Sequence, residues 1–244
     1  MTTRFYLGEF PTTRWSLVSL GRDSTDPDQR HKALADLCQL YWLPIYAFAR
    51  RKGLSTQDAE DLTQEFCGKL ANEDLLRNAN PDRGKLRTWM LKIVTHDLLD
   101  ARRAQQAQKR GGDVEIISID QALAEEQLIL PPAHSETPDH TFSRVWALRV
   151  LESAMQWTAQ EYAAAGKTDL FTALRSSLDA ESGDTDYETI TKSTGLNKNA
   201  ARQAVSRLRV KFREALHLII ADTLVNPTEA DITEELRYLQ ASLS

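Results

Sequence analysis

The stretch from Tyr187 to Arg213 constrains the fold most, because it has the pattern of two helices joined by a tight turn. A short helix is expected from about Tyr187 to Thr194, ended by Gly195, whose backbone can adopt the turn conformation. Asn197 can then cap a second helix through its side-chain oxygen. Apolar residues at helical spacing predict one buried stripe on that helix, and they are Ala201, Ala204, Val205, Leu208 and Phe212.

Basic and polar residues of this second helix share a different face. Residues 192 to 213 contain seven Lys or Arg and no Asp or Glu, although the whole chain has a net charge of -5. A solvated basic face would have the same spacing, but a local excess against an acidic background favours a nucleic-acid surface. The layout is typical of a helix-turn-helix, whose expected DNA contacts are Lys198, Asn199, Arg202, Gln203, Ser206, Arg207, Arg209 and Arg213.

Composition predicts an all-α protein, and the length allows one large domain or two small ones; the acidic linker described below divides the chain into two small helical domains. The 244 residues are 41% hydrophobic and 27% charged, which is typical of a globular chain. Helix-favouring residues dominate, and alternating β-branched residues are almost absent. No apolar run approaches the roughly 20 residues that span a bilayer, and the N-terminus lacks a signal-peptide core. Cys38 and Cys67 have neither metal nor disulfide spacing, so we expect buried thiols in a reducing cytoplasm.

A helix that begins after Ser55 is predicted to carry an acidic face. Ser55 and Asp58 stand in the relation of a capping box. The apolar stripe of this helix is Ala59, Leu62, Phe66 and Leu70, and its other side carries Asp58, Asp61 and Glu65. Carboxylates at these spacings could hold a metal, but no histidine lies nearby. A solvated or protein-binding acidic face is therefore favoured.

A longer helix, roughly from Leu86 to Gln108, is predicted to be basic. Its Trp89, Lys92, His96 and Arg103 are spaced so that they lie on one side. An aromatic ring among cations suits single-stranded nucleic acid, because the ring stacks on an unpaired base while the cations follow phosphate. A tryptophan on a helix is more often a core residue. Residues 81 to 110 contain eight basic and three acidic residues, however, which favours the nucleic-acid interpretation.

The two domains are separated by an acidic segment. Residues 111–140 contain seven acidic residues, no Lys or Arg, and three prolines, as expected for a linker. We therefore place the first domain at 1–110, the linker at 111–140, the second domain at 141–224 and a helical tail at 225–244. Ile232, Leu236 and Leu239 share one face of the tail, which we expect to dock on the second domain or on a partner.

No residue pattern indicates catalysis. The five histidines have no metal spacing, and no Ser-His-Asp or Cys-His set is present. Residues 165–168 look like the end of a phosphate-binding loop, but Glu161 stands where its first glycine is required. We therefore expect no enzyme, no metal site and no cofactor.

The order of these features resembles bacterial RNA polymerase sigma factors of the extracytoplasmic-function (ECF) type, over nearly the whole chain. Residues 58–66 look like the core-polymerase-binding helix of that family, and residues 87–103 look like its promoter-melting and minus-ten helix. Residues 187–213 look like its minus-thirty-five module. The opening residues 10–15 and the tail residues 234–239 resemble a long-tailed subgroup.

This resemblance implies a non-enzymatic, cytoplasmic sigma factor that binds core RNA polymerase, recognises promoter DNA and initiates transcription. Residues 1–110 would be its region 2 and residues 141–224 its region 4. The implied polymerase contacts are Asp58, Asp61, Gln64, Glu65 and Phe66. The implied minus-ten contacts are Arg87, Trp89, Lys92, His96, Arg102 and Arg103.

Three questions stay open at this point. His96 stands where the family usually has Asn, which leaves the minus-ten preference undecided. An anti-sigma factor or another regulatory partner is neither indicated nor excluded. The alternative function is a free-standing helix-turn-helix regulator whose N-terminal domain dimerises or senses a signal.

Overall fold

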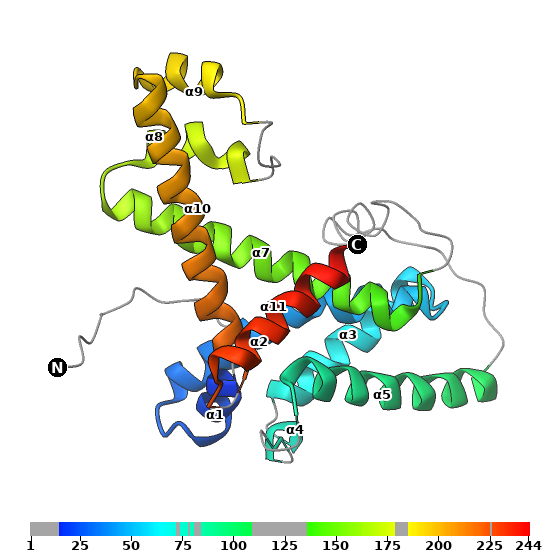
Figure 1. The fold of residues 1–244 in the computed structure, drawn as a ribbon. Coiled ribbons are helices and arrows are strands. Elements are labelled where there is room, and N and C mark those ends of the chain that lie inside the picture. The colour runs from blue at the N-terminus through cyan, green and yellow to red at the C-terminus, as the bar shows by residue number, and fades with distance from the viewer. Residues whose placement is uncertain are drawn as a thin grey trace. The chain divides into compact units, whose positions relative to one another are not determined.

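The computed structural model describes residues 15–71, 74–77, 79–80, 84–108, 136–178, 185–224 and 226–244. Within these residues all regular structure is helical and no strand occurs, which confirms the predicted all-α class (Figure 1). The predicted acidic linker, apart from residues 136–140, lies outside the described residues. The described chain divides into two compact units, each of which is considered by itself.

The first unit, called here the N-terminal unit, joins the described residues up to Arg149 to Ile220–Ser244. The second, the C-terminal unit, comprises Val150–Ile219 in the described part. The division falls inside helix α7, Pro138–Ala164. Residues 225–244, which the sequence suggests as a separate tail, thus belong to the N-terminal unit except for Val225, which is not described.

Five helices open the N-terminal unit: α1 (Trp15–Asp23), α2 (Pro27–Arg51), α3 (Thr56–Ala71), α4 (Asp74–Arg77) and α5 (Leu86–Gln108). Helix α2 begins where the Asp26 carboxylate accepts hydrogen bonds from the backbone of Asp28 and Gln29, with Pro27 in the first turn. It continues through Pro44. Apolar side chains from α2, α3 and α5 form the core, where Leu37, Ile45, Phe48, Phe66 and Met90 are almost completely buried.

The two cysteines are only partly buried, so the expectation of buried thiols was wrong. Both are free, and the Cys38 thiol lies 3.9 Å from the backbone oxygen of Cys67. One residue is on α2 and the other on α3, and each helix turns its larger apolar side chains, such as Leu37 and Phe66, to the core. The small thiols therefore lie at the margin of the packed surface.

The C-terminal unit contains the end of α7, α8 (Thr168–Leu174), a 3-10 turn (Arg175–Leu178), α9 (Tyr187–Thr194) and α10, Lys198–Ala221, as far as Ile219. Gly195 ends α9 in the left-handed conformation, with φ of 68°. The Asn197 side chain accepts a hydrogen bond of 2.9 Å from the backbone of Ala200 and so caps α10. Both local expectations are confirmed.

Most of the apolar residues expected to form a buried stripe on α10 do lie in the core of this unit. Ala201, Val205 and Leu208 are buried, while Ala204 packs against them from a partly exposed position. Phe212 is also only partly buried. The buried partners from the preceding helices are Tyr162, Phe171, Leu174 and Ile190.

The last helix, α11 (Glu229–Leu243), starts with a capping box between Thr228 and Asp231. Its buried side is Ile232, Glu235, Leu239 and Ser242. Of the shared face expected from sequence, Ile232 and Leu239 are buried and Leu236 is only partly buried. The helix docks within the N-terminal unit: the Tyr238 hydroxyl lies 2.7 Å from Ser143 Oγ in the first turns of α7.

A single carboxylate joins the start of α7 to the end of α2. Glu136 accepts hydrogen bonds from Arg144 Nε at 2.8 Å and from Arg51 Nη2 at 3.4 Å, and it lies 2.8 Å from His140 Nδ1. Burial by itself would raise the pKa of Glu136. The hydrogen bonds from Arg144 and His140 outweigh that effect and lower the pKa to about 2.

We predict that Glu136→Gln lowers the free energy of unfolding by about 2–3 kcal/mol near neutral pH. Because the pKa is lowered in the folded state, the stabilisation is complete above the ordinary pKa of 4.5 and disappears as the pH falls towards 2. Urea unfolding of wild type and variant between pH 7 and pH 2.5 measures this convergence. Glu161→Gln, which removes an exposed pair with Lys211, should follow wild type throughout. A stability gap that is the same at all pH values would contradict the prediction.

Candidate nucleic-acid and polymerase interface

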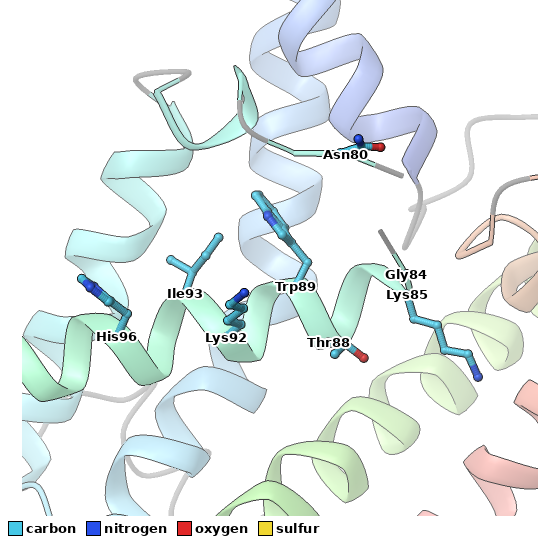
Figure 2. Close-up of a pocket in the computed structure, with 8 residues that line it drawn as sticks. All are labelled: Asn80, Gly84, Lys85, Thr88, Trp89, Lys92, Ile93 and His96. Atoms are coloured by element: carbon cyan, nitrogen blue, oxygen red, sulfur yellow. The ribbon is translucent and has the colours of Figure 1, made fainter. Parts of the chain in front are cut away.

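The first candidate site is a pocket beside the N-terminal half of α5 (Figure 2). Its volume is about 350 Å³. Trp89, Ile93 and His96 extend towards the same side of the helix, while the Lys85 side chain points away from them. The lining residues are Asn80, Gly84, Lys85, Thr88, Trp89, Lys92, Ile93 and His96. The structure thus brings together three of the residues proposed from sequence for minus-ten contact, namely Trp89, Lys92 and His96.

Trp89 belongs partly to the core and partly to the pocket. Its indole packs against the buried Trp15, with ring centroids 6.2 Å apart and the planes tilted by 43°. The side chain is nevertheless only partly buried and lines the pocket, while Lys92 and His96 on the same face are exposed. The Trp89 indole is thus packed against Trp15 and also accessible from the pocket, which suits stacking on a planar ring. The adjacent ammonium group of Lys92 is suited to phosphate.

Arg87 lies elsewhere, because two residues along a helix correspond to a rotation of about 200°. Only 8% of the residue is exposed. Its guanidinium lies 3.9 Å from the ring centre of Tyr238 and 5.1 Å from that of Trp146, and it pairs with the Glu235 carboxylate. Burial lowers the pKa of Arg87, although the neighbouring Tyr238 acts in the opposite direction. In this arrangement Arg87 is held inside the unit and does not line the pocket.

The other two arginines proposed for minus-ten contact, Arg102 and Arg103, lie in the last turns of α5. Their side chains are outside the described part of the structure. Their roles stay predictions.

The acidic face of α3 is present on the surface. Asp61, Gln64 and Glu65 are exposed, and Glu65 pairs with Lys69 at 2.9 Å. Asp58 is partly buried, and the Ser55 hydroxyl donates to its carboxylate at 2.7 Å at the helix start.

Phe66 lies on the opposite side of α3. Only 1% of it is exposed. It therefore packs in the core and does not contribute to the exposed acidic face.

Helix α10 presents a polar and basic surface. Seven of the eight residues proposed there for DNA contact are exposed, and they are Lys198, Asn199, Arg202, Gln203, Ser206, Arg207 and Arg213. The Arg202 guanidinium also lies 5.8 Å from the ring centre of Tyr187 on α9, which links the two helices.

Arg209 differs from these residues because it is partly buried. Its Nη2 donates to the Ser177 backbone oxygen at 2.9 Å and to the Thr185 hydroxyl at 3.1 Å. Ser177 is itself buried. This guanidinium thus ties α10 to the chain on both sides of residues 179–184, and its assignment as a phosphate contact stays a prediction.

The described residues contain no group of three or more His, Cys, Asp or Glu placed to hold a metal ion. None of the helices in this part of the chain is long and apolar enough to cross a membrane.

Residues 37–108 match the family Sigma-70 region 2. The match extends from α2 to the end of α5, and so includes both the acidic face of α3 and the pocket on α5. It supports a sigma factor. No curated protein and no solved structure matches the chain.

Sequence reasoning missed five of the residues that line the pocket, namely Asn80, Gly84, Lys85, Thr88 and Ile93. Lys85 stands one residue before α5, and its side chain points away from that of Trp89, so helical spacing gave no signal for it. Asn80 follows α4 in an irregular segment, and no local signal connects it to α5. The contact of Glu235 with α5 was also missed, because nothing in the spacing of the tail indicates a partner in another helix.

We predict different effects from two arginines of α10. Arg209→Ala should lower the free energy of unfolding by about 1–3 kcal/mol, because the buried carbonyl of Ser177 loses its charged donor. Arg213→Ala should change it by less than about 0.5 kcal/mol, because Arg213 is exposed. Urea denaturation of both variants measures the difference. Equal stability of the two variants would assign Arg209 no structural role.

Proposed function

We propose that this chain is a sigma factor of the ECF type that binds core RNA polymerase, recognises promoter DNA and helps to open the start site. The observation that carries the proposal is the pocket on α5, which lies within the segment that matches sigma-70 region 2. A sigma factor acts together with polymerase in the cytoplasm.

The pocket supports a role in holding an unpaired base. Promoter opening exposes bases whose stacking partners are lost, and an aromatic side chain replaces about 1–3 kcal/mol of stacking per base. Trp89 offers such a ring, and Lys92 supplies a cation on the same face. His96 lies at the same pocket, and an imidazole can donate or accept a hydrogen bond at a base edge. We propose that His96 contributes to the minus-ten preference.

For the minus-thirty-five element we propose that α9 and α10 act as a helix-turn-helix. Arg202 and Gln203 are exposed in the second turn of α10, where a recognition helix meets base edges in the major groove. Arg207 and Arg213 are exposed further along and are suited to phosphate contacts. Arg209 is the least suited of the arginines, because its hydrogen bonds lie within the protein.

For polymerase binding we propose the exposed acidic face of α3, formed by Asp61, Gln64 and Glu65. The buried Phe66 on the opposite side anchors the helix in the core. A rigid helix with a charged outer face is suited to an electrostatically complementary protein surface. Copurification of the chain with core RNA polymerase, followed by transcription on a genomic library, tests the function as a whole.

We predict that Asp61→Lys combined with Glu65→Lys abolishes copurification with core polymerase, because the acidic face is reversed in charge. Helical content should be retained, since both side chains are exposed. The matched control is Asp28→Lys with Glu214→Lys, which reverses two exposed acids on α2 and α10. Circular dichroism confirms folding of both proteins. If the α3 variant copurifies as well as the control, polymerase binds elsewhere.

We predict that Trp89→Ala slows promoter opening about tenfold, the size of one lost stacking contact, while closed complexes form normally. Permanganate footprinting measures the unpaired bases. Trp89→Phe should recover part of the effect, and Thr88→Ala, which alters the pocket without removing a ring, should behave like wild type. If Trp89 serves only as the packing partner of Trp15, Trp89→Ala will instead lower stability and leave opening unchanged.

A further inference from the structure

The side chain of Glu235 on α11 is completely buried and yet carries a carboxylate. Its Oε2 lies 2.6 Å from Lys85 Nζ, and its Oε1 pairs with Arg87 Nη1. The preceding residue, Glu234, also reaches Lys85 at 3.4 Å, but its side chain is 71% exposed. The two adjacent glutamates therefore differ in their surroundings, and only Glu235 joins both cations.

A buried carboxylate is expensive unless its charge is matched. Here the match comes from two residues at one place, Lys85 immediately before α5 and Arg87 in its first turn. Removing the carboxylate would take the direct ion pair away from the enclosed guanidinium of Arg87. The contact consequently restricts how the start of α5 can move relative to α11.

The rings of Tyr238 and Trp146 pack on the Arg87 guanidinium and, together with Glu235, enclose it; this group of residues is called the enclosure below. Tyr238 stands three residues after Glu235, so both side chains lie on the same side of α11. Its ring packs on the Arg87 guanidinium, and its hydroxyl lies 2.7 Å from Ser143 Oγ. Trp146 of α7 packs on the same guanidinium. The starts of α5 and α7 therefore meet α11 at Arg87.

This enclosure adjoins the pocket without filling it. Lys85 lines the pocket, and Trp89 follows it by one helical turn. No residue of α11 lines the pocket, and Arg87 lies about 200° around the helix from Trp89. Helix α11 thus contacts one side of the first turns of α5, and the Trp89 indole lies on the opposite side.

We propose that Glu235 is a positioning residue for promoter opening: by docking α11 against Lys85 and Arg87, it fixes the first turn of α5 so that Trp89 is held in place to receive an unpaired base. The inference rests on the proposed function and assigns the C-terminal helix to the same activity. An inhibitory tail would have the opposite effect, because it would withhold Lys85 from DNA and its loss would speed opening.

The test uses the full chain reconstituted with core polymerase. Glu235→Gln keeps the shape and removes the charge, and Glu234→Gln is the matched control on the exposed neighbour. Positioning predicts about tenfold fewer open complexes for Glu235→Gln, similar to the loss of one stacking contact, with normal holoenzyme formation. Glu234→Gln should match wild type. Opening by Glu235→Gln at the wild-type rate, or faster, would overturn the inference.

Hydrogen exchange of the free protein provides a second measurement that needs no polymerase. The first turns of α5 should exchange faster in Glu235→Gln, while α3 keeps its wild-type protection. Equal loss of protection in both helices would show a general structural role and overturn the inference. If the wild-type chain forms no holoenzyme, the proposed function fails, but this measurement still decides whether Glu235 holds α5.

A third variant addresses the loss of stability that a buried uncompensated charge causes. Arg87→Met combined with Glu235→Leu replaces the ion pair by apolar side chains of similar size, an exchange that is often neutral or stabilising. If docking of α11 is what positions α5, this double variant should open promoters faster than Glu235→Gln and approach the wild-type rate. Opening as slow as in the single variant, in a protein of wild-type stability, would overturn the inference.

Discussion

The helical repeat of α5 is the constraint on which the candidate site depends. Leu86, Met90, Val94 and Leu98 recur along one side and are buried in the core of the N-terminal unit. Because the repeat is close to 3.6 residues per turn, residues offset from this stripe by about half a turn lie on an outer side of the helix. Trp89, Lys92 and His96 occupy that outer side. Packing of the inner stripe thus sets the orientation of the side chains proposed to meet DNA.

Charge is distributed unevenly over the described surface. Acidic side chains are exposed on α3, and basic side chains are exposed on α10, in a chain whose net charge is -5. An exposed basic helix is suited to an anionic nucleic acid, and an exposed acidic helix is suited to a complementary protein surface. The phosphate-dependent part of DNA binding should weaken with salt, because each neutralised phosphate releases counterions.

Two buried or nearly buried carboxylates organise the N-terminal unit. Glu136 joins the start of α7 to Arg51 on α2, and Glu235 joins α11 to the start of α5. Ion pairs of this kind add little net stability relative to apolar packing, but each is costly to break once formed. Their effect is to select one arrangement of helices. For α11 this arrangement places a C-terminal helix in the same unit as the region 2 segment.

The sequence alone determined the features that depend on neighbours within a turn or two. The all-α class, the left-handed Gly195, the Asn197 cap and the buried positions Ala201, Val205 and Leu208 all follow from local spacing and backbone preference. The shared face of Trp89, Lys92 and His96 has the same origin.

Only the tertiary structure decided which charged and aromatic side chains turn inwards. A basic residue carries the same charge whether its partner is a phosphate or a carboxylate of its own chain, so the pattern could not separate Arg87 and Arg209 from the exposed arginines. The docking of α11 joins residues as far apart as Lys85 and Glu234, 149 positions along the chain. Helical periodicity describes neighbours within a few turns of one helix, so it cannot predict a pairing between distant helices. Such a pairing arises only when the apolar faces of separate helices pack together.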